Sequence, residues 1–407
     1  MESKPLQGIR VLEFGGYISG PYATSLLCAL GADVVKVERV GQGDDFRRGE
    51  DDRSPYFVQF NAGKRSISVD LKHPEGLALV SALIPHFDVA LENLRPGKLA
   101  AVGLGPDFCR SLRPDLIYTS VTGFGDGGPL ADYPAYDTIA QAFSGLYTLL
   151  GDEGGAQLTG TIFADLVTGL STATGVLAAL VARGTTGKGT HVQTSLIEAV
   201  SSITADAFTQ FFATGHRNPT RQTRHPQAQN FCLRTASGDF IAIHCSSSQK
   251  FWRGLTQAID LPELAEDPRF INYNQRDHHY FELVPIVEAE VAKRTYDEWA
   301  KILSDHDVPF SPVHTMDGFI RHPQVEWLEL VEPEHDGLSL LRPPWRFDGT
   351  RPDRKAKAPR VGQHTREIAA EVYAPERIEA LISSGVLGVT ASGNATGQAR
   401  PPSSQSC

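Results

Sequence analysis

Asp165 is the residue whose type and surroundings most favour chemistry. It is the lone carboxylate between Gly160 and Gly169, among apolar and small residues, and it precedes a helical pattern over Leu166 to Arg183. Carboxylates attack acyl centres, and N–H groups at the start of a helix can hold the oxyanion that develops. The same place also suits an N-cap, whose carboxylate accepts hydrogen bonds from the first turn. Position alone therefore leaves two interpretations of Asp165 open, a nucleophile and a cap.

Basic residues near strand ends are candidates for binding phosphate. Lys64, Arg65 and Lys72 suit that role, but a solvated basic edge explains them equally well from sequence alone. The pair Gly15-Gly16 after the first apolar run would let a ligand approach the backbone closely, although glycine pairs are also common in turns.

Other familiar motifs are absent or incomplete. The sequence contains no GxGxxG, GxSxG or HExxH pattern. The stretch from Gly184 to Gly189 resembles a phosphate loop, but Ala182 replaces its leading glycine and Gly189 the magnesium-binding Ser or Thr, so we expect a helix end and turn. His278 and His279 lack a third ligand nearby, and we expect no metal site.

Composition indicates a soluble, two-domain protein. The chain has 407 residues, of which 41% are hydrophobic and 21% charged, and no uninterrupted apolar run approaches the length of a membrane span. A formal charge of −10 argues against general nucleic-acid binding. Five scattered cysteines without a CxxC pair, and an N-terminus without an apolar segment, favour the cytoplasm.

The elements that must position Asp165 begin with an alternation of strands and helices over the first 125 residues. We predict strands at 9–14, 34–39, 66–70, 88–93 and 116–121, and helices at 21–30, 74–86 and 107–112. Such alternation is typical of a doubly wound, mostly parallel (Rossmann-like) α/β sheet. In these sheets ligands bind beyond the carboxyl ends of the strands.

The rest of the chain predicts a second domain. Residues 130–215 have mainly helical patterns, and 215–226 are polar, basic and contain proline, which indicates a linker. A β-hairpin over 231–244, helices at 250–260 and 281–292, and a capping box from Thr295 to Glu298 then favour a smaller α+β domain. We assign 1–215 to the large domain, 226–325 to the small domain, 326–390 to a linker and the C-terminal part of the large domain, and 391–407 to a disordered tail.

In their order, these segments resemble the class III CoA-transferases, the family of formyl-CoA transferase and carnitine CoA-transferase. The resemblance runs from about Leu6 to Ile368 and rests on ten pieces, none specific by itself. These ten lie at 6–14, 19–21, 30–39, 61–72, 92–97, 123–129, 136–142, 264–270, 308–309 and 361–367, and the Asp165 helix stands in order between 136–142 and 264–270.

The resemblance implies a role for nine residues. Asp165 matches the family's nucleophile, and Asp137 matches an acidic position near its reaction centre, as an orienting group or as an N-cap before Thr138–Leu146. The remaining residues fall where the family holds the adenine, ribose and phosphates of coenzyme A, with Lys98 as a further phosphate contact: Arg39, Leu71, Lys72, Asn93, Leu94, Arg95 and Lys98. These positions follow predicted strand ends, and cations suit phosphates.

The resemblance also implies a reaction and its partners. An acyl-CoA and a carboxylic acid, a dicarboxylate such as succinate for example, would be substrates, with Asp165 passing through anhydride and aspartyl-CoA intermediates and no metal required. N–H groups of the helix N-terminus would hold the oxyanions. The family forms an interlocked homodimer, and neither nucleic acid nor a membrane is an expected partner.

Departures from the family limit the substrate assignment. Ala101 stands at an often basic position, so Lys98 is expected to supply that charge. Ile18 replaces a polar residue of the formyl enzymes, and 224–230, which corresponds to their mobile cover, has no glycine. Both differences argue against a formyl or oxalyl group.

Two other functions stay open. An α-methylacyl-CoA racemase needs a histidine just before the Asp137 position, where this chain has Tyr136, a weak base at neutral pH. A non-catalytic acyl-CoA-binding protein is the alternative of another class, against which the intact Asp165 argues.

Overall fold

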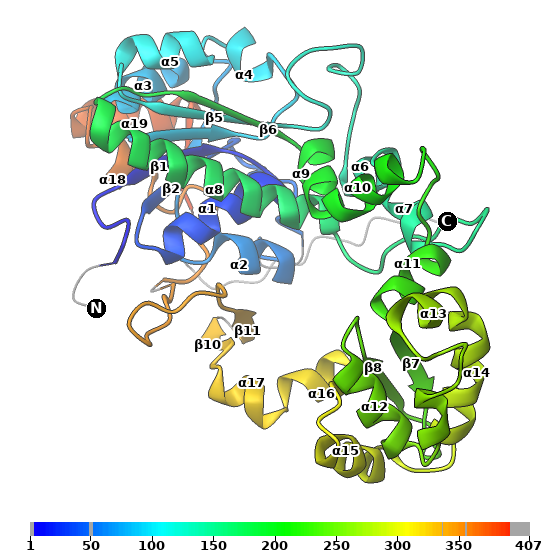
Figure 1. The fold of residues 1–407 in the computed structure, drawn as a ribbon. Helices are drawn as coiled ribbons and strands as arrows, with labels where there is room; N and C mark the ends of the chain where they lie inside the picture. The colour runs from blue at the N-terminus through cyan, green and yellow to red at the C-terminus, as the bar shows by residue number, and fades with distance from the viewer. Residues whose placement is uncertain (1–3, 49–51, 336, 355, 391–407) are drawn as a thin grey trace, which may run out of the picture. The chain divides into compact units, whose positions relative to one another are not determined.

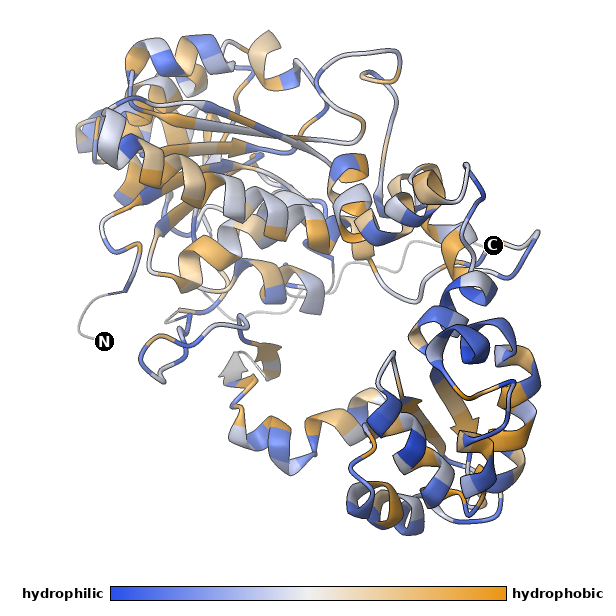
Figure 2. Ribbon diagram, viewed as in Figure 1, coloured by the Kyte–Doolittle hydropathy of each residue, from blue (hydrophilic) through white to orange (hydrophobic). Residues whose placement is uncertain are grey.

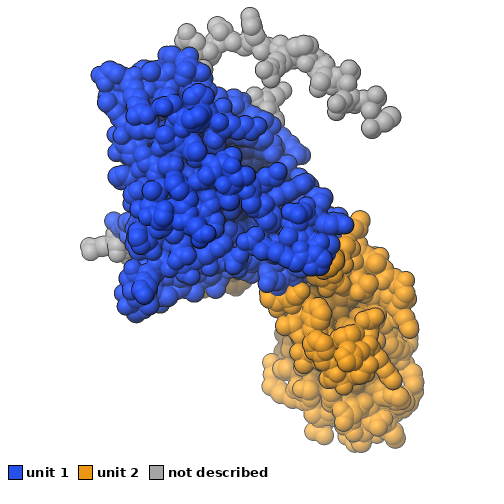
Figure 3. Space-filling view, turned by 90° about the horizontal axis from the view of Figure 1, so that it is seen from above, with its two compact units in different colours: residues 1–140, 162–200, 330–407 blue, residues 141–161, 201–329 orange. Residues whose placement is uncertain are grey.

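The computed structural model describes residues 4–48, 52–335, 337–354 and 356–390. The tail from Ala391 to Cys407, which the sequence predicts to be disordered, lies outside the described residues. Contacts divide the chain into two compact units (Figure 3). Unit 1 contains residues 1–140, 162–200 and 330–407, and unit 2 contains 141–161 and 201–329. The domain boundaries given above stay predictions.

Unit 1 is built on a seven-stranded sheet (Figure 1). Its strand order is β12-β3-β2-β1-β4-β5-β6, parallel throughout except for antiparallel β12 at one edge. The strands are β1 (Arg10–Phe14), β2 (Asp33–Glu38), β3 (Arg65–Val69), β4 (Val89–Glu92), β5 (Ile117–Thr122), β6 (His191–Ser195) and β12 (Leu387–Gly388). The mostly parallel sheet predicted from the sequence is thus confirmed. Its order reverses between β1 and β4, the place where such sheets bind ligands.

Helices cover both faces of this sheet because its strands are apolar on both sides. Along β1, Val11 packs with α1 and α8, whereas Leu12 packs with α3, α5, α18 and α19 on the other face. The helices of unit 1 are α1 (Ser19–Ala29), α2 (Pro55–Asn61), α3 (Pro74–Leu83) with a 3₁₀ turn at Ile84–His86, α4 (Lys98–Ala101), α5 (Pro106–Leu112), α8 (Phe163–Thr186), α18 (Thr365–Ala369) and α19 (Pro375–Ser383). Figure 2 shows the apolar strands between these helices.

A small sheet and two helices complete this part of the chain. A separate two-stranded antiparallel sheet is formed by β10 (Val331–His335) and β11 (Leu338–Leu341). Helices α6 (Asp137–Phe143) and α9 (Leu196–Ile203) begin in unit 1 and end in unit 2.

The sequence analysis missed strand β6, which lies within the region expected to be mainly helical. Its residues, His191-Val-Gln-Thr-Ser195, are mostly polar, and none but Ser195 is buried. An edge strand next to β5 needs no apolar run, because only one side of its backbone pairs with the sheet. The periodicity therefore gave no signal for it.

Helix α8 is the element that carries Asp165. It is longer than predicted, and among the described residues it is the one helix long and apolar enough to cross a membrane by length and composition. Its buried side chains, Ala173, Val176 and Ala179 among them, pack in the core with α1. These are the contacts of a core helix. The helix ends at Thr186, and Gly187 is its C-cap with a left-handed φ of 66°. This agrees with the helix end and turn expected over Gly184 to Gly189.

Unit 2 holds a three-stranded antiparallel sheet, in the order β7-β8-β9, with helices packed around it. The predicted hairpin is confirmed by β7 and β8, and the capping box by reciprocal bonds between Thr295 and Glu298. Elements of unit 2 are α7 (Leu146–Leu150), α10 (Ala205–Ala213), α11 (Arg221–Ala228), β7 (Asn230–Arg234), β8 (Phe240–His244), α12 (Gln249–Ala258), a 3₁₀ helix (Pro262–Ala265), α13 (Tyr273–His278), α14 (Tyr280–Val291), α15 (Tyr296–Asp305), β9 (Phe310–Pro312), α16 (Met316–Ile320) and α17 (Pro323–Trp327).

Helix α11 corrects the prediction of a linker over 215–226. Thr220 caps it by accepting a hydrogen bond from the Thr223 N–H, and the Thr223 hydroxyl accepts one from the Thr220 N–H. A capping box with threonine in place of glutamate escaped the sequence pattern. Pro226 near the end of the helix also favoured a loop.

Candidate active site

A cavity of about 1140 Å³ opens in unit 1 where the strand order reverses. Its lining comes from the carboxyl ends of β1, β2, β3 and β4 and from the start of α8. All nine residues that the resemblance selected line this one cavity: Arg39, Leu71, Lys72, Asn93, Leu94, Arg95, Lys98, Asp137 and Asp165. Their roles stay predictions, but the fold brings them together from segments up to 126 residues apart (39 to 165).

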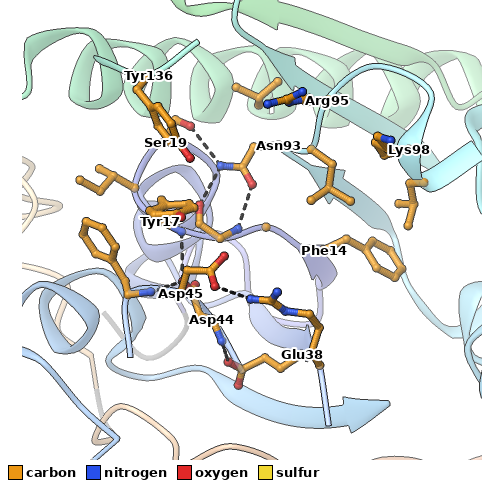
Figure 4. A pocket seen from close by; sticks show the side chains of 18 of the residues that line it. Phe14, Tyr17, Ser19, Glu38, Asp44, Asp45, Asn93, Arg95, Lys98 and Tyr136 are labelled. Atoms are coloured by element: carbon orange, nitrogen blue, oxygen red, sulfur yellow. Dashed lines mark hydrogen bonds and ion pairs between the residues drawn. The ribbon is translucent and has the colours of Figure 1, made fainter. Parts of the chain in front are cut away.

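Asn93 holds together the loops that follow β1 and β4. Its Oδ1 accepts a hydrogen bond from the Gly16 N–H at 2.9 Å, and its Nδ2 donates to the Gly16 carbonyl at 2.8 Å and the Ser19 hydroxyl at 3.2 Å. A Cβ on Gly15 would lie 3.1 Å from the Asn93 Oδ1. The absence of a side chain at Gly15 therefore lets the Asn93 side chain approach the backbone closely. Both glycines also line the cavity. Figure 4 shows these bonds around Asn93.

Asp165 lies in the first turn of α8, at its third residue, and is not the N-cap, which is Ile162. The capping interpretation of Asp165 is therefore wrong. Burial among apolar groups raises the pKa of Asp165 to about 7; the charge of Asp137 adds to the rise, and a hydrogen bond from Ser19 opposes it. The carboxylate is consequently more basic than an exposed aspartate, and close to half ionised at neutral pH.

The carboxylate that caps α8 belongs to Asp137. Its Oδ1 accepts hydrogen bonds from the N–H groups of Ala164 at 2.8 Å and Asp165 at 3.2 Å. Asp137 is the first residue of α6, so it joins the starts of two helices. This corrects the expectation that those first-turn N–H groups are open to an oxyanion, since Asp137 occupies both. An orienting role for Asp137 stays a prediction, now with a geometric basis.

Gly169 allows α8 to lie directly against α1. A Cβ at this position would meet Tyr22 Cδ1 at 2.7 Å and the Ser19 carbonyl at 3.1 Å. Any larger residue would push the helices apart. One turn earlier on α8 is Asp165, so this close packing sets the distance between its carboxylate and Ser19.

The cationic part of the cavity consists of Lys72, Arg95 and Lys98, which are exposed. Within the described residues, no acidic side chain pairs with any of the three. Figure 4 shows Arg95 and Lys98 on the opposite side of Asn93 from Tyr17 and Tyr136. Unpaired ammonium and guanidinium groups at strand ends suit a polyphosphate ligand.

The other residues predicted to contact coenzyme A differ in how much of each side chain is available to a ligand. Arg39 donates to the Gly43 carbonyl and pairs with Asp45 at 2.5 Å, so part of its donor capacity is already used. Leu94 is exposed, and Leu71 is partly buried. Ala101 ends α4 outside the cavity lining, whereas Lys98, at the start of the same helix, lines it. The role of Lys98 as the source of that charge stays a prediction.

A buried ion cluster lies beneath the loops that line the cavity. Lys36 Nζ contacts Glu13 Oε1 at 2.6 Å and Asp44 Oδ2 at 2.8 Å, and Lys64 Nζ contacts Glu13 Oε2 at 2.8 Å. Burial alone would raise the pKa of Glu13, but the two ammonium groups outweigh it and lower that pKa. Lys64 is 1% exposed and Arg65 pairs with Asp33, so neither is a phosphate ligand or a solvated edge.

Sequence reasoning gave no role to Tyr17, Ser19 or Asp44. Asp44 Oδ1 accepts hydrogen bonds from the N–H groups of Tyr17 at 3.1 Å and Phe46 at 2.9 Å. Tyr17 has a φ of 60°, a left-handed conformation rare for residues other than glycine. Asp44 follows a glycine-rich turn, a sequence feature from which a role for this acid could have been predicted. No sequence feature indicates the left-handed backbone of Tyr17.

The arrangement joins a basic, partly buried carboxylate to a cationic strip along the strand ends. Such a carboxylate can attack an activated carbonyl carbon, and the strip can hold a phosphorylated leaving group. Together they favour acyl chemistry on a ligand that also carries anionic groups.

Comparisons with known proteins agree with this chemistry. A family model described as CoA-transferase family III matches residues 6–365. The human succinyl-CoA:glutarate CoA-transferase is 31% identical over 94% of this chain and 90% of its own length. The succinate–glutarate CoA-transferase of Agrobacterium fabrum is 32% identical, over 92% and 97%. A solved CAIB/BAIF family protein from Brucella suis is 31% identical, with a TM-score of 0.79 over 91% of this chain and all of that one.

Proposed function

This chain belongs to CoA-transferase family III and is an acyl-CoA:carboxylate CoA-transferase, and from that premise we propose that Asp165 carries the transferred groups. The single observation that carries the proposal is the position of Asp165. It is a partly buried carboxylate of raised pKa, in the lining of a cavity that also contains unpaired cations. The substrates of the relatives, succinyl-CoA and glutarate by name, do not fix those of this chain.

The proposed reaction has four displacements. The Asp165 carboxylate attacks the donor thioester carbonyl, and CoA thiolate leaves a mixed anhydride. The thiolate then attacks the aspartyl carbonyl, which releases the donor acid and leaves an aspartyl-CoA thioester. The acceptor carboxylate displaces the thiolate from that carbonyl to give a second anhydride. Attack of the thiolate on the acceptor carbonyl finally yields the new acyl-CoA and restores the carboxylate. Every step keeps an activated acyl bond.

Burial serves this chemistry in two ways. A carboxylate with a pKa of about 7 is a stronger nucleophile than one with an ordinary pKa, while a useful fraction is still ionised at neutral pH. Screening from water protects the anhydrides and the thioester, whose hydrolysis would waste the donor. Ser19 donates a hydrogen bond to the carboxylate and limits the rise of its pKa.

For the coenzyme we propose that Lys72, Arg95 and Lys98 bind phosphate groups, with Arg39, Leu71, Asn93 and Leu94 around the nucleoside. The exposed, unpaired cations and the neighbouring leucines support this placement. The thiol end then points along the cavity toward Asp165. Coenzyme A is a substrate here and leaves with the product.

Asp165→Asn tests the proposal directly. The amide should keep the dissociation constant of CoA, because it removes no phosphate contact, and abolish transfer with every donor. A panel of acyl-CoA donors and carboxylic acids, followed by mass spectrometry of the CoA products, provides the assay. Turnover by the variant would remove Asp165 from the reaction.

We also propose an interlocked homodimer in the cytoplasm. Apolar side chains exposed in the single chain support an interface, among them Val181 on α8 and Phe212 on α10. The described cysteines are free thiols, as a reducing compartment favours: Cys28, Cys109, Cys232 and Cys245. Sedimentation of the purified chain should give the mass of a dimer; a monomer would contradict it.

The alternatives stated above have less support. Tyr136 stands where a racemase needs histidine, and its ring contacts Tyr17. Incubation with branched acyl-CoA in deuterium oxide should therefore leave the α-proton unexchanged. A purely binding protein does not agree with membership in a transferase family.

A further inference from the structure

One end of the cavity is lined by aromatic rings. The Tyr17 ring lies 5.3 Å from that of Phe46 and 5.6 Å from that of Tyr136, both edge to face. All three residues line the cavity, and Tyr56 packs behind Phe46 at 5.9 Å. These distances and angles are those that aromatic pairs prefer. We name Tyr17, Phe46 and Tyr136 the aromatic wall.

The aromatic wall lines the same cavity as Asp165 and is connected to it by short chain segments. Tyr136 directly precedes Asp137, whose carboxylate binds the N–H groups of Ala164 and Asp165. Tyr17 is two residues before Ser19, which hydrogen-bonds to Asp165. The other lining residues here are aliphatic: Ile18, Ile162 and Leu196. An acyl group bonded to Asp165 would thus meet rings and aliphatic groups.

Buried polar bonds hold the aromatic wall in place. The Asp44 carboxylate accepts the N–H groups of both Tyr17 and Phe46, and Lys36 fixes that carboxylate from below. A hydrogen bond with Tyr136 raises the pKa of Tyr17 to about 12, so this phenol is neutral. Tyr17 also keeps a left-handed φ of 60°, although glycine would adopt it without strain. Strained residues held by several bonds are concentrated at ligand sites.

We propose that the aromatic wall is the acyl-binding subsite, and that this enzyme carries acyl groups with a flat, apolar body, such as aryl-substituted acids. The inference rests on the proposed function, because it places the acyl group on Asp165. An aryl group can pack edge to face on Tyr17 and Tyr136 and exclude water from the anhydride. A short dicarboxylate would place its second charge against uncharged rings.

Arg48 provides the competing possibility. It lines the cavity, and its guanidinium carbon lies 5.5 Å from the Phe46 ring centre. If the acyl group were a dicarboxylate, its distal carboxylate would bind this cation. The two substrate classes therefore depend on different side chains, Tyr17 for aryl groups and Arg48 for dicarboxylates.

The test compares donors by formation of the Asp165 adduct and by kcat/KM. Phenylacetyl-CoA and cinnamoyl-CoA represent aryl groups, succinyl-CoA a dicarboxylate and acetyl-CoA a small group without a ring. We expect the aryl donors to exceed the other two by at least about tenfold in kcat/KM. A preference for succinyl-CoA would overturn the inference. An adduct with any donor keeps the proposed function, whereas none with all four donors would end both.

Variants assign the preference to its residues. Tyr17→Ala should lower kcat/KM for the aryl donors about tenfold, mainly through KM, and change that for acetyl-CoA less than twofold. Tyr17→Phe should restore the aryl donors, and an unchanged dissociation constant of CoA shows that each variant is folded. Arg48→Gln should leave the aryl donors unchanged. An unchanged kcat/KM for the aryl donors in Tyr17→Ala, or its loss in Arg48→Gln, would contradict the assignment.

Discussion

At the scale of single residues, the site depends on the unfavourable burial of one carboxylate. Asp165 is placed among apolar groups and beside a second acid, and both effects raise its pKa to about 7. The environment that destabilises the ionised carboxylate in the folded state also makes it more basic, and therefore a better nucleophile toward an acyl carbon. The proposed catalytic role and the stability penalty are therefore two consequences of one environment.

Replacing Asp165 by Asn should accordingly stabilise the protein above neutral pH. The folded pKa lies above the unfolded value, so wild-type stability is complete below about pH 4 and is lost as pH rises through about 7. The neutral amide avoids that loss, on the order of 2–4 kcal/mol. Thermal unfolding at pH 8 and pH 4.5 measures it. A higher Tm for the variant at pH 8 and a smaller gain at pH 4.5 are expected; equal gains would contradict the raised pKa.

Asp137 should act through Asp165, as a positioning residue. Asp137→Asn removes a negative charge but keeps an oxygen that can accept the α8 N–H groups, so the acid limb of kcat/KM should move to lower pH. Asp137→Ala also removes the cap, at a further cost of about 1 kcal/mol in unfolding free energy. A pH profile of Asp137→Asn identical to wild type would show that its charge does not reach Asp165.

The residue types at the site were predictable, and their contacts were not. The family resemblance selected Asp165, Asn93 and Lys98, and the convergence of strand ends in a parallel sheet agrees with that choice. Nothing in the sequence shows that Asp137 rather than Asp165 caps α8, because both precede helical patterns. Long-range bonds of this kind depend on how loops fold back, which periodicity does not encode.

At the scale of elements, the decisive contact is between α1 and α8. Both helices begin at the candidate active site, with Ser19 on one and Asp165 on the other. Their separation is set where Gly169 faces Tyr22 and the Ser19 carbonyl. Precise placement of a nucleophile by close helix packing is a general requirement for attack at short range.

Two glycines of α8 provide a matched test. Gly169→Ala should cost about 1–3 kcal/mol through overpacking and lower kcat, because the new Cβ moves α8 relative to α1. Gly184→Ala in the same helix meets no atom within 4 Å and should gain up to about 1 kcal/mol, with activity unchanged. Denaturant unfolding and steady-state rates measure both. Equal effects of the two substitutions would show that the helix contact does not position Asp165.

Sequence patterns predicted strands of two kinds. β1, β2 and β4 are buried on both faces and contain several Val and Leu residues. β3 and β5 combine β-branched residues with polar ones. β6 and α11 were missed because an edge strand and a threonine capping box carry weaker patterns. β9, three residues long, joins the sheet only through the partner strand β8. Short or polar strands such as β6 and β9 form because they pair with a neighbouring strand, and not because their own residues favour strand conformation.

At the scale of the whole molecule, charge is divided between the surface and the site. The protein carries a formal charge of −10, yet Lys72, Arg95 and Lys98 concentrate positive charge at the strand ends. An acidic surface discourages binding to nucleic acid, while a local cluster attracts a polyphosphate. The exposure of these cations means that salt screens them.

Binding of CoA should therefore weaken with salt and with each cation removed. Lys72→Ala, Arg95→Ala and Lys98→Ala are each expected to cost about 1 kcal/mol, roughly fivefold in Kd, and to reduce its salt dependence. Lys188→Ala, an exposed lysine outside the cavity, changes the net charge equally and is the control. Calorimetry at two NaCl concentrations measures these constants. The same loss in the control would mean that net charge, not a site, attracts CoA.

The most direct measurement is peptide mapping after incubation with an acyl-CoA donor. Borohydride reduces an aspartyl thioester to an alcohol, and hydroxylamine converts it to a hydroxamate, so either reagent marks the residue that carried CoA. We predict a modified peptide containing Asp165, formed only with donor and lost in Asp165→Asn. Transfer that proceeds while this peptide stays unmodified, or modification of a different carboxylate, would contradict it.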